Sequence, residues 1–142
     1  MNDNNNKDHI KLSLPNKPEF VSVARLTASS IASRIGFNIE DIEDIKVAIG
    51  EACTNAIQHS SLNESDSYEI EFILDIDKLI IYIRDEGNGK CKKDIKTPNV
   101  EELKESGLGL FIIKTLMDEV KCISCEDKGT EIRMVKRIEV GV

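Results

Sequence analysis

The stretch Glu51-Ala52-Cys53-Thr54-Asn55-Ala56-Ile57-Gln58-His59 gives the strongest indication of how this chain of 142 residues folds. It lies in a segment whose apolar residues recur at steps of three and four, which predicts an amphipathic helix. These apolar residues are Ile42, Ile45, Ile49, Ala52 and Ala56. Glu51, Asn55 and His59 follow one another along a different face, about 6 Å per step. The helix therefore presents a carboxylate and an amide one turn apart, within reach of one ligand.

Two glycine-containing motifs follow along the chain. Asp85 comes where an alternating apolar run ends, and Gly87 and Gly89 come just after it. A carboxylate at a strand end can accept a hydrogen bond from a purine amino group, and glycines let a ring approach the backbone. The segment Gly107-Leu108-Gly109 lies at a predicted helix start, where free N–H groups and the helix dipole favour an anion. In this order, the three motifs outline an ATP site.

Glu51 and Asn55 match the chemistry that such a site needs. The Asn55 carbonyl oxygen is a hard ligand of the kind that Mg²⁺ accepts while it keeps waters and phosphate oxygens. Glu51 is placed to take a proton from a hydroxyl that attacks the terminal phosphate, a contribution of typically ~10²–10⁴-fold. A serine or threonine hydroxyl needs such a base, whereas a histidine nucleophile does not. Each motif alone also fits a solvated helix, an acidic turn or a close helix contact, so the prediction rests on their combination.

The N-terminal part of the chain predicts a strand and two helices. Residues 9–14 alternate between apolar and polar, as in a strand. Pro18 suits the first position of a helix, and Gly36 suits a left-handed stop at its end. Asn38 then caps the next helix, which carries the carboxylate and the amide and ends near His59. The two helices are therefore separated by a very short connection.

The C-terminal part predicts a hairpin, a helix and two closing strands. Strands over residues 68–76 and 79–84 form a hairpin that delivers Asp85 to its end. A helix over 107–120 follows, and two strands flank a turn at 126–129. Between the hairpin and that helix, residues 87–106 lack periodicity, and a stretch of this length in a compact domain is usually a lid or disordered. We expect it to act as a lid whose cations could close over phosphates, namely Lys90, Lys92, Lys93 and Lys96.

Composition limits the class of protein. With 40% apolar residues, the chain suits a single domain, which we expect over residues 9–142 after a disordered tail of residues 1–8. The formal net charge of -7 argues against direct binding of nucleic acid. No apolar run approaches the ~20 residues that span a membrane. The polar start does not look like a secretory signal, so we expect a cytoplasmic protein.

The motifs also resemble those of a known family. Residues 51–59 look like the N box, 83–87 like the first glycine box and 106–110 like the second glycine box of the anti-sigma factor serine kinases of the RsbW and SpoIIAB type. These belong to the GHKL superfamily of gyrase, heat-shock chaperone, histidine-kinase and MutL ATPase domains. The resemblance covers about residues 13–137. It implies an α/β two-layer sandwich of the Bergerat type, with a mixed sheet and helices on one face.

The resemblance also implies roles for individual residues. Glu51 would be the general base, Asn55 the Mg²⁺ ligand and Asp85 the partner of the adenine amino group. The other positions implied to bind ATP are Gly87 and Gly89 beside the adenine, Ser106, Gly107, Leu108 and Gly109 at the phosphates, and Thr130, which helps to hold the base.

The biology implied by the resemblance is a partner switch in a stress response or in sporulation. A homodimer would bind a sigma factor, keep it from RNA polymerase, and phosphorylate a serine or threonine of a STAS-type anti-anti-sigma factor. Arg25 matches an arginine that touches the sigma factor in SpoIIAB-type proteins, although a solvated helix arginine would look the same.

One departure from the family pattern leaves an alternative open. Some relatives carry an arginine before the Ser-Gly of the second glycine box, where this chain has Glu105. Lys104 or a lid lysine could replace the missing cation, but spacing does not decide between them. The alternative function is a nucleotide-gated module that binds a sigma factor without phosphotransfer. A histidine-kinase catalytic domain is a further alternative, but the sequence has no second helical hairpin bearing a phosphoacceptor histidine.

Overall fold

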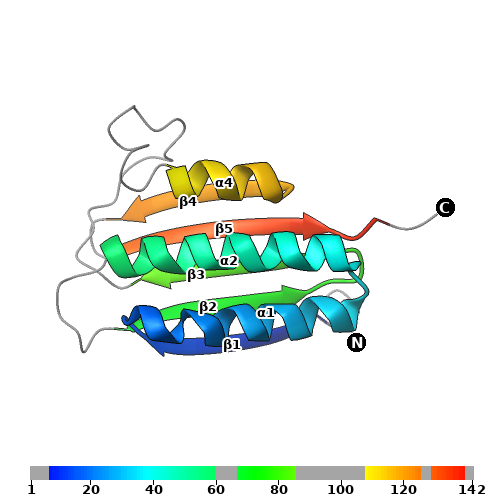
Figure 1. Ribbon diagram of the computed structural model, residues 1–142, viewed down its shortest axis with the longest axis horizontal. Helices are drawn as coiled ribbons and strands as arrows, with labels where there is room; N and C mark the ends of the chain where they lie inside the picture. The colour runs from blue at the N-terminus through cyan, green and yellow to red at the C-terminus, as the bar shows by residue number, and fades with distance from the viewer. Residues whose placement is uncertain (1–6, 60–66, 86–107, 126–128, 140–142) are drawn as a thin grey trace.

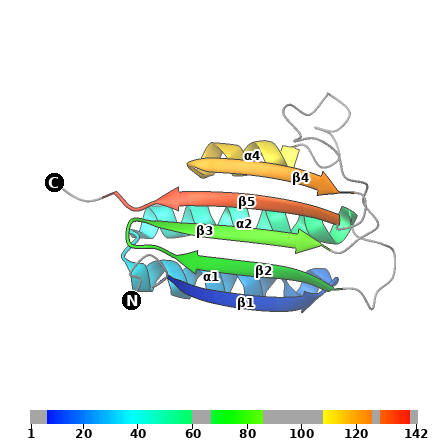
Figure 2. The ribbon, with the colours of Figure 1, turned by 180° about the vertical axis from the view of Figure 1, so that it is seen from behind.

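The computed structural model describes residues 7–59, 67–85, 108–125 and 129–139, and these form two layers. Three α-helices lie side by side on one face of a five-stranded sheet (Figure 1). Seen from behind, the strands lie in front and no described helix covers them (Figure 2). The expected α/β two-layer sandwich with helices on one face is therefore confirmed.

The sheet has the strand order β1-β2-β3-β5-β4, and each neighbouring pair is antiparallel. The expectation of a mixed sheet was wrong among the described strands. β4 does run in the same direction as β3, but β5 lies between them and pairs antiparallel with both. The strands are β1 (Asp8–Pro15), β2 (Ser67–Leu74), β3 (Lys78–Asp85), β4 (Glu119–Cys125) and β5 (Gly129–Arg137).

The helices begin and end largely where local chemistry predicts. Gly36, which follows α1, adopts a left-handed conformation with φ 107° and ends that helix, because residues with a Cβ rarely adopt it. Asn38 accepts a hydrogen bond from the Asp41 N–H at 2.7 Å, as a helix N-cap does. Pro18 opens a short 3₁₀ turn that leads into α1. The elements are η2 (Pro18–Phe20), α1 (Val21–Ile35), α2 (Ile39–His59) and α4 (Leu108–Leu116).

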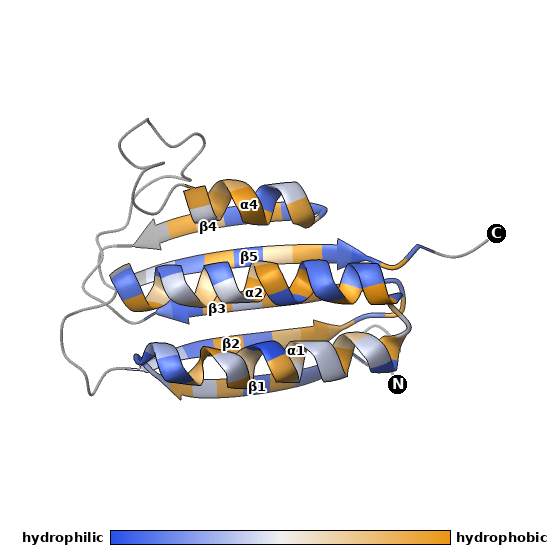
Figure 3. Cartoon of the chain, in the orientation of Figure 1, coloured by the Kyte–Doolittle hydropathy of each residue, from blue (hydrophilic) through white to orange (hydrophobic). Residues whose placement is uncertain are grey.

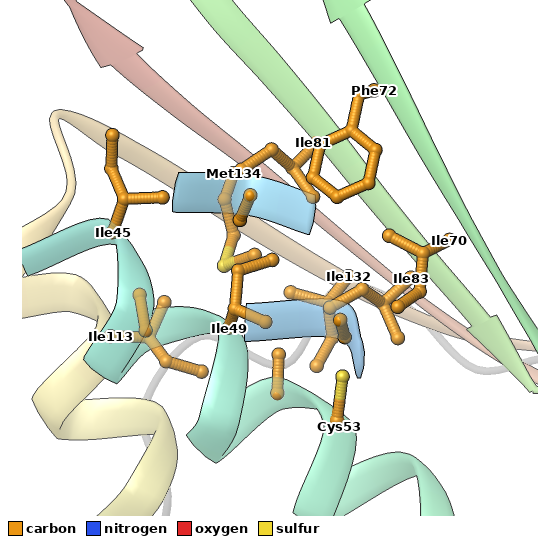
Figure 4. Packing of buried hydrophobic residues seen from close by; sticks show 14 of the residues in the cluster. Ile45, Ile49, Cys53, Ile70, Phe72, Ile81, Ile83, Ile113, Ile132 and Met134 are labelled. Atoms are coloured by element: carbon orange, nitrogen blue, oxygen red, sulfur yellow. The ribbon is translucent and has the colours of Figure 1, made fainter. Parts of the chain in front are cut away.

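The core lies between the sheet and the helices. Ile45, Ile49 and Cys53 point from α2 toward the strands, and Ile113 approaches them from α4 (Figure 4). All four side chains are fully buried. Each buried isoleucine contributes about 1.5–3 kcal/mol through apolar burial. Figure 3 shows that α4 is the most hydrophobic of the three helices along its length, whereas α1 and α2 carry hydrophilic residues on the side facing the viewer.

The helix predicted over residues 107–120 ends earlier than expected. α4 stops at Leu116, and Val120 lies in β4. The Asp118 N–H donates a hydrogen bond to the Val135 carbonyl at 2.9 Å, and the Asp118 carboxylate accepts one from the Arg137 N–H at 2.6 Å. These bonds to β5 replace the hydrogen bonds that would have continued the helix.

Two other boundaries differ from the expectations. β2 ends at Leu74, and Ile76 is exposed in the connection to β3. At the N-terminus, Lys7 forms an ion pair with Asp75 at 3.4 Å and Asp8 begins β1, so the folded part starts earlier than the expected tail of residues 1–8 allows. Among the helices that the structure describes, none has the length and apolar character needed to cross a membrane.

Candidate functional site

Glu51 and Asn55 meet the start of α4. Both lie on the side of α2 that faces α4, and Gly109 is buried against them. A Cβ atom built on Gly109 would lie 2.7 Å from Glu51 Oε1, 3.6 Å from Asn55 Oδ1 and 3.7 Å from Asn55 Nδ2. The backbone of Gly109 therefore packs directly on both polar side chains. The structure brings together residues that the sequence placed in two separate motifs.

Helical periodicity explains how one helix serves both the core and this site. Cys53 lies between Glu51 and Asn55 in sequence, but its side chain points into the core (Figure 4). Burial raises the pKa of the Cys53 thiol to about 12, so the group remains a neutral thiol at neutral pH. Glu51 and Asn55, two positions before and after it, are partly exposed. α2 thus presents an apolar face to the sheet and a carboxylate and an amide to α4.

Asp85 and Thr130 form a second part of the site. Asp85 is the last residue of β3, with only 2% of its surface exposed. The Thr130 N–H, at the start of β5, donates a hydrogen bond to Asp85 Oδ1 at 3.4 Å. The antiparallel pairing of β3 with β5 makes this contact possible, because it places Glu131 opposite Arg84. Two further predicted site residues, far apart in sequence, are therefore neighbours.

The two parts of the site lie at the same end of the molecule. In Figure 1 the C-terminal end of α2, the end of β3, the start of β5 and the N-terminal end of α4 all lie at the left. The N-terminus of a helix is the positive end of its dipole and attracts anions. The N-terminus of α4 lies in this region. Leu108, the first residue of α4, is exposed there.

Arg25 lies on the opposite side of α2. It is an exposed residue of α1, and its Cδ atom is 3.7 Å from where a Cβ on Gly50 would be. α2 runs between α1, which carries Arg25, and α4, which carries Gly109 (Figure 1). The structure does not bring Arg25 together with the other candidate residues.

Some predicted site residues lie outside the described residues. Gly87, Gly89, Ser106 and Gly107 belong to this group, as does the whole of the lid expected over 87–106. Their assignments remain predictions.

Arg84 is a residue whose importance the sequence analysis missed. Its guanidinium lies 2.7 Å from Glu131, 3.0 Å from Glu71 and 3.2 Å from Glu69. These ion pairs link β3 to both neighbouring strands, one residue before Asp85. The alternation of side chains along a strand puts Arg84 on the sheet face opposite Asp85. This alternation was visible in the sequence, but the strand register that brings three glutamates to one arginine was not.

Glu71 sits at the centre of this group of charges. Its Oε2 atom is 2.8 Å from His9 Nδ1, and its Oε1 atom is 3.0 Å from Arg84. The hydrogen bond with His9 and then the Arg84 guanidinium hold the pKa of Glu71 below its usual value, against the opposing effect of burial. Ion pairs of Arg84 and Glu71 therefore join neighbouring strands on the sheet face that no described helix covers, close to Asp85 and Thr130 in sequence.

Comparison with known proteins identifies the class to which this fold and site belong. The family model of the histidine kinase-like ATPase domain matches residues 14–136. A crystal structure of the RsbU and RsbW domains of a Mycobacterium tuberculosis protein superimposes with a TM-score of 0.70 at 17% identity, covering 95% of this chain and 34% of that one. At this identity the structural match supports the fold alone.

Curated relatives narrow the class further. The serine-protein kinase RsbW of Bacillus subtilis is 41% identical over 93% of this chain and 87% of its own length. Its counterpart from Bacillus velezensis is 40% identical over 91% and 85%, and that from Oceanobacillus iheyensis is 46% identical over 82% and 79%. The chain therefore belongs to the RsbW family of serine-protein kinases within the histidine kinase-like ATPases. The family resemblance of its motifs is confirmed.

Proposed function

We propose that this protein is a cytoplasmic anti-sigma factor that binds a sigma factor and uses Mg-ATP to phosphorylate a serine or threonine of a STAS-type anti-anti-sigma factor. The packing of Gly109 on Glu51 and Asn55 carries this proposal. It joins a carboxylate and an amide to the start of a helix, a combination that can serve as base, metal ligand and phosphate site in phosphoryl transfer to a hydroxyl. Family membership supports the same chemistry, since the relatives are serine-protein kinases.

The donor groups present fit Mg-ATP. Asn55 offers one carbonyl oxygen, which suits Mg²⁺ because this ion keeps most of its shell for water and phosphate oxygens. When bound, the ion neutralises charge that develops on the transferred phosphoryl group. Glu51 stands one turn away to accept the proton of the attacking hydroxyl. The backbone of Leu108 and Gly109, with Ser106 and Gly107 before them, is proposed to bind the phosphates at the start of α4.

Asp85 is proposed to bind the adenine end of the nucleotide. Its carboxylate is almost fully buried and already accepts a hydrogen bond from the Thr130 N–H. This bond orients the carboxylate, which can then accept a hydrogen bond from the adenine amino group. Thr130 therefore supports base recognition, and Gly87 and Gly89 are proposed to line the ring.

Arg25 is proposed to contact the sigma factor. It is an exposed residue of α1, a helix that also exposes two apolar side chains, Val23 at 40% and Leu26 at 68%. Arginine is enriched at protein–protein interfaces and among the residues that contribute most to their affinity. We also propose that the protein works as a homodimer and acts in a stress response or in sporulation. It is proposed to consist of one domain that includes β1 from Asp8 onward, with a lid over residues 87–106.

The first experiment tests phosphotransfer. The purified protein is incubated with Mg²⁺, γ-labelled ATP and a STAS-type anti-anti-sigma protein, and the labelled residue is identified. Glu51→Gln should abolish labelling while nucleotide binding persists, because the amide keeps the shape of the side chain but accepts no proton. Glu43→Gln is the matched control, since this exposed acid on the same helix pairs only with Lys46, at 3.3 Å, among the contacts described.

The result separates the kinase from its alternative. Label on a serine or threonine that is lost in Glu51→Gln and kept in Glu43→Gln supports the proposal. Nucleotide binding without label on any STAS-type partner would contradict it and favour a nucleotide-gated binding module. Chelation of Mg²⁺ should stop labelling, and labelling that survives chelation would contradict the metal assignment to Asn55.

A further inference from the structure

The two described glycines inside helices have very different surroundings. A Cβ on Gly109 would lie 2.7 Å from Glu51 Oε1, well inside the roughly 3.3 Å at which carbon and oxygen make close contact. A Cβ on Gly50 would meet only Arg25 Cδ at 3.7 Å, an ordinary contact. The Glu51 carboxylate therefore occupies space that a side chain at position 109 would need, whereas position 50 has room.

α4 is not free to move away and relieve such a clash. Leu110 and Ile113 are buried between it and the rest of the core. At its far end, the Lys136 ammonium donates a hydrogen bond to the Leu116 carbonyl at 2.6 Å. The same ammonium lies 3.7 Å from Asp44 on α2, so the ends of the two helices are linked through β5. A methyl group at position 109 must therefore be accommodated by the flexible end of Glu51.

Asn55 would not be displaced by the same methyl group. Its side-chain atoms would lie 3.6 and 3.7 Å from the added carbon, within the range of ordinary contacts. The clash is thus confined to one oxygen of the carboxylate. A single substitution at Gly109 can separate the position of Glu51 from that of the amide one turn away.

We propose that Gly109 is a positioning residue for the Glu51 carboxylate. Because residue 109 has no side chain, the carboxylate of the proposed base can occupy the space beside its backbone. This inference rests on the proposed function, because it concerns the residue that would accept the substrate proton. It assigns Gly109 a role distinct from its expected place at the phosphates. A phosphate role predicts weaker nucleotide binding on substitution, whereas a positioning role predicts slower transfer at unchanged binding.

Three variants test this role. Gly109→Ala introduces the clash, and Glu51→Asp combined with Gly109→Ala relieves it by withdrawing the carboxylate by one methylene. Gly50→Ala is the matched control, since it adds the same methyl group inside a helix where space exists. Three quantities are measured: kcat for phosphotransfer, the Kd for ATP, and the NMR shift of the ¹³C-labelled Glu51 carboxyl carbon in nucleotide-free protein.

We expect Gly109→Ala to lower kcat about tenfold or more, because a positioned base contributes roughly 10²-fold or more. The Kd for ATP should change less than about twofold, and the Glu51 carbon resonance should move. The kcat of the double variant should be at least about threefold higher than that of Gly109→Ala, since the effects of two touching residues are not additive. Gly50→Ala should match the wild type in all three quantities.

Each contrary result overturns the inference. An unchanged kcat in Gly109→Ala, or a Kd raised tenfold with kcat unchanged, would leave Gly109 with a nucleotide-binding role only. A double variant no faster than Gly109→Ala would show that the clash is not with Glu51. If the wild type transfers no phosphate at all, the proposed function fails separately. The carboxyl resonance still decides the positioning role in that case, because a shift no larger than that of Gly50→Ala rejects it.

Discussion

The Thr130 N–H and the Asp85 carboxylate are joined by a hydrogen bond of 3.4 Å that connects the start of β5 to the end of β3. The carboxylate is almost completely buried, so its orientation depends on the protein groups around it rather than on water. A backbone donor at this point fixes which oxygen faces β5. The charged group proposed to recognise adenine is therefore oriented by the last strand of the sheet.

Asp85→Asn should weaken ATP binding about tenfold or more. The amide has the same shape, but its NH₂ group brings a donor to a place where either the Thr130 N–H or the adenine amino group also donates. Hydrogen bonds to charged groups contribute about 1.5–3 kcal/mol, which corresponds to this loss. Calorimetric titration with ATP measures the affinity, and thermal unfolding checks that the fold is kept. Affinity equal to that of the wild type would remove Asp85 from the base site.

Arg25→Ala should lower the affinity for the sigma factor about tenfold while phosphotransfer to the anti-anti-sigma protein stays the same. Arginines at the centre of interfaces often contribute at least this much, and Arg25 belongs to α1, which α2 separates from α4 (Figure 1). Arg34→Ala, an exposed arginine in the last turn of the same helix, is the control. Equal affinity of both variants, measured by surface plasmon resonance, would reject the assignment.

Glu71→Gln should make the free energy of unfolding fall less steeply as the pH is lowered. The pKa of Glu71 is lowered in the folded protein by His9 and Arg84, so the unfolded chain takes up this proton at a higher pH. The stabilisation is complete above the unfolded value of about 4.3 and is lost as the pH falls through the lower folded value. The midpoints of urea unfolding should therefore differ most between the wild type and Glu71→Gln at pH 6 to 7, and they should converge below about pH 4. A constant difference across this range would contradict the titration of Glu71.

Ile113→Ala should destabilise the fold by about 2–4 kcal/mol. The side chain is fully buried between α4 and α2, and truncation of such an isoleucine leaves a cavity. Thr115→Ala, on the exposed side of the same helix, should change stability by less than about 0.5 kcal/mol. Urea unfolding of both variants measures the difference, and equal midpoints would show that α4 contributes little to the core.

The sequence predicted best those features that depend on local chemistry. Gly36 ends a helix because of its left-handed φ, and Asn38 caps the next because its side chain reaches the Asp41 N–H. The periodicity of α2 likewise predicted that Glu51 and Asn55 share a face. In each case neighbours within one helical turn determine the outcome.

Features that depend on distant partners could not be predicted in the same way. α4 ends four residues before the expected position because Asp118 bonds to β5, and nothing within the helix itself signals this end. The insertion of β5 between β3 and β4 made the sheet antiparallel, and strand register brought three glutamates to Arg84. The contact between Gly109 and Glu51 also depends on how two helices pack, whereas the sequence indicated only that both residues belonged to motifs.

The insertion of β5 between β3 and β4 also determines when the site can form during synthesis on the ribosome. β3 emerges first, but one of its edges stays open until β5 arrives, and Thr130 follows Asp85 by 45 residues. The hairpin of β2 and β3 and the packing of α1 on α2 can form earlier, because their contacts are closer in sequence. A nascent chain that lacks β5 therefore displays an unpaired edge of β3 and no Thr130 N–H to orient Asp85, so we expect the ability to bind a nucleotide only after β5 has been synthesised.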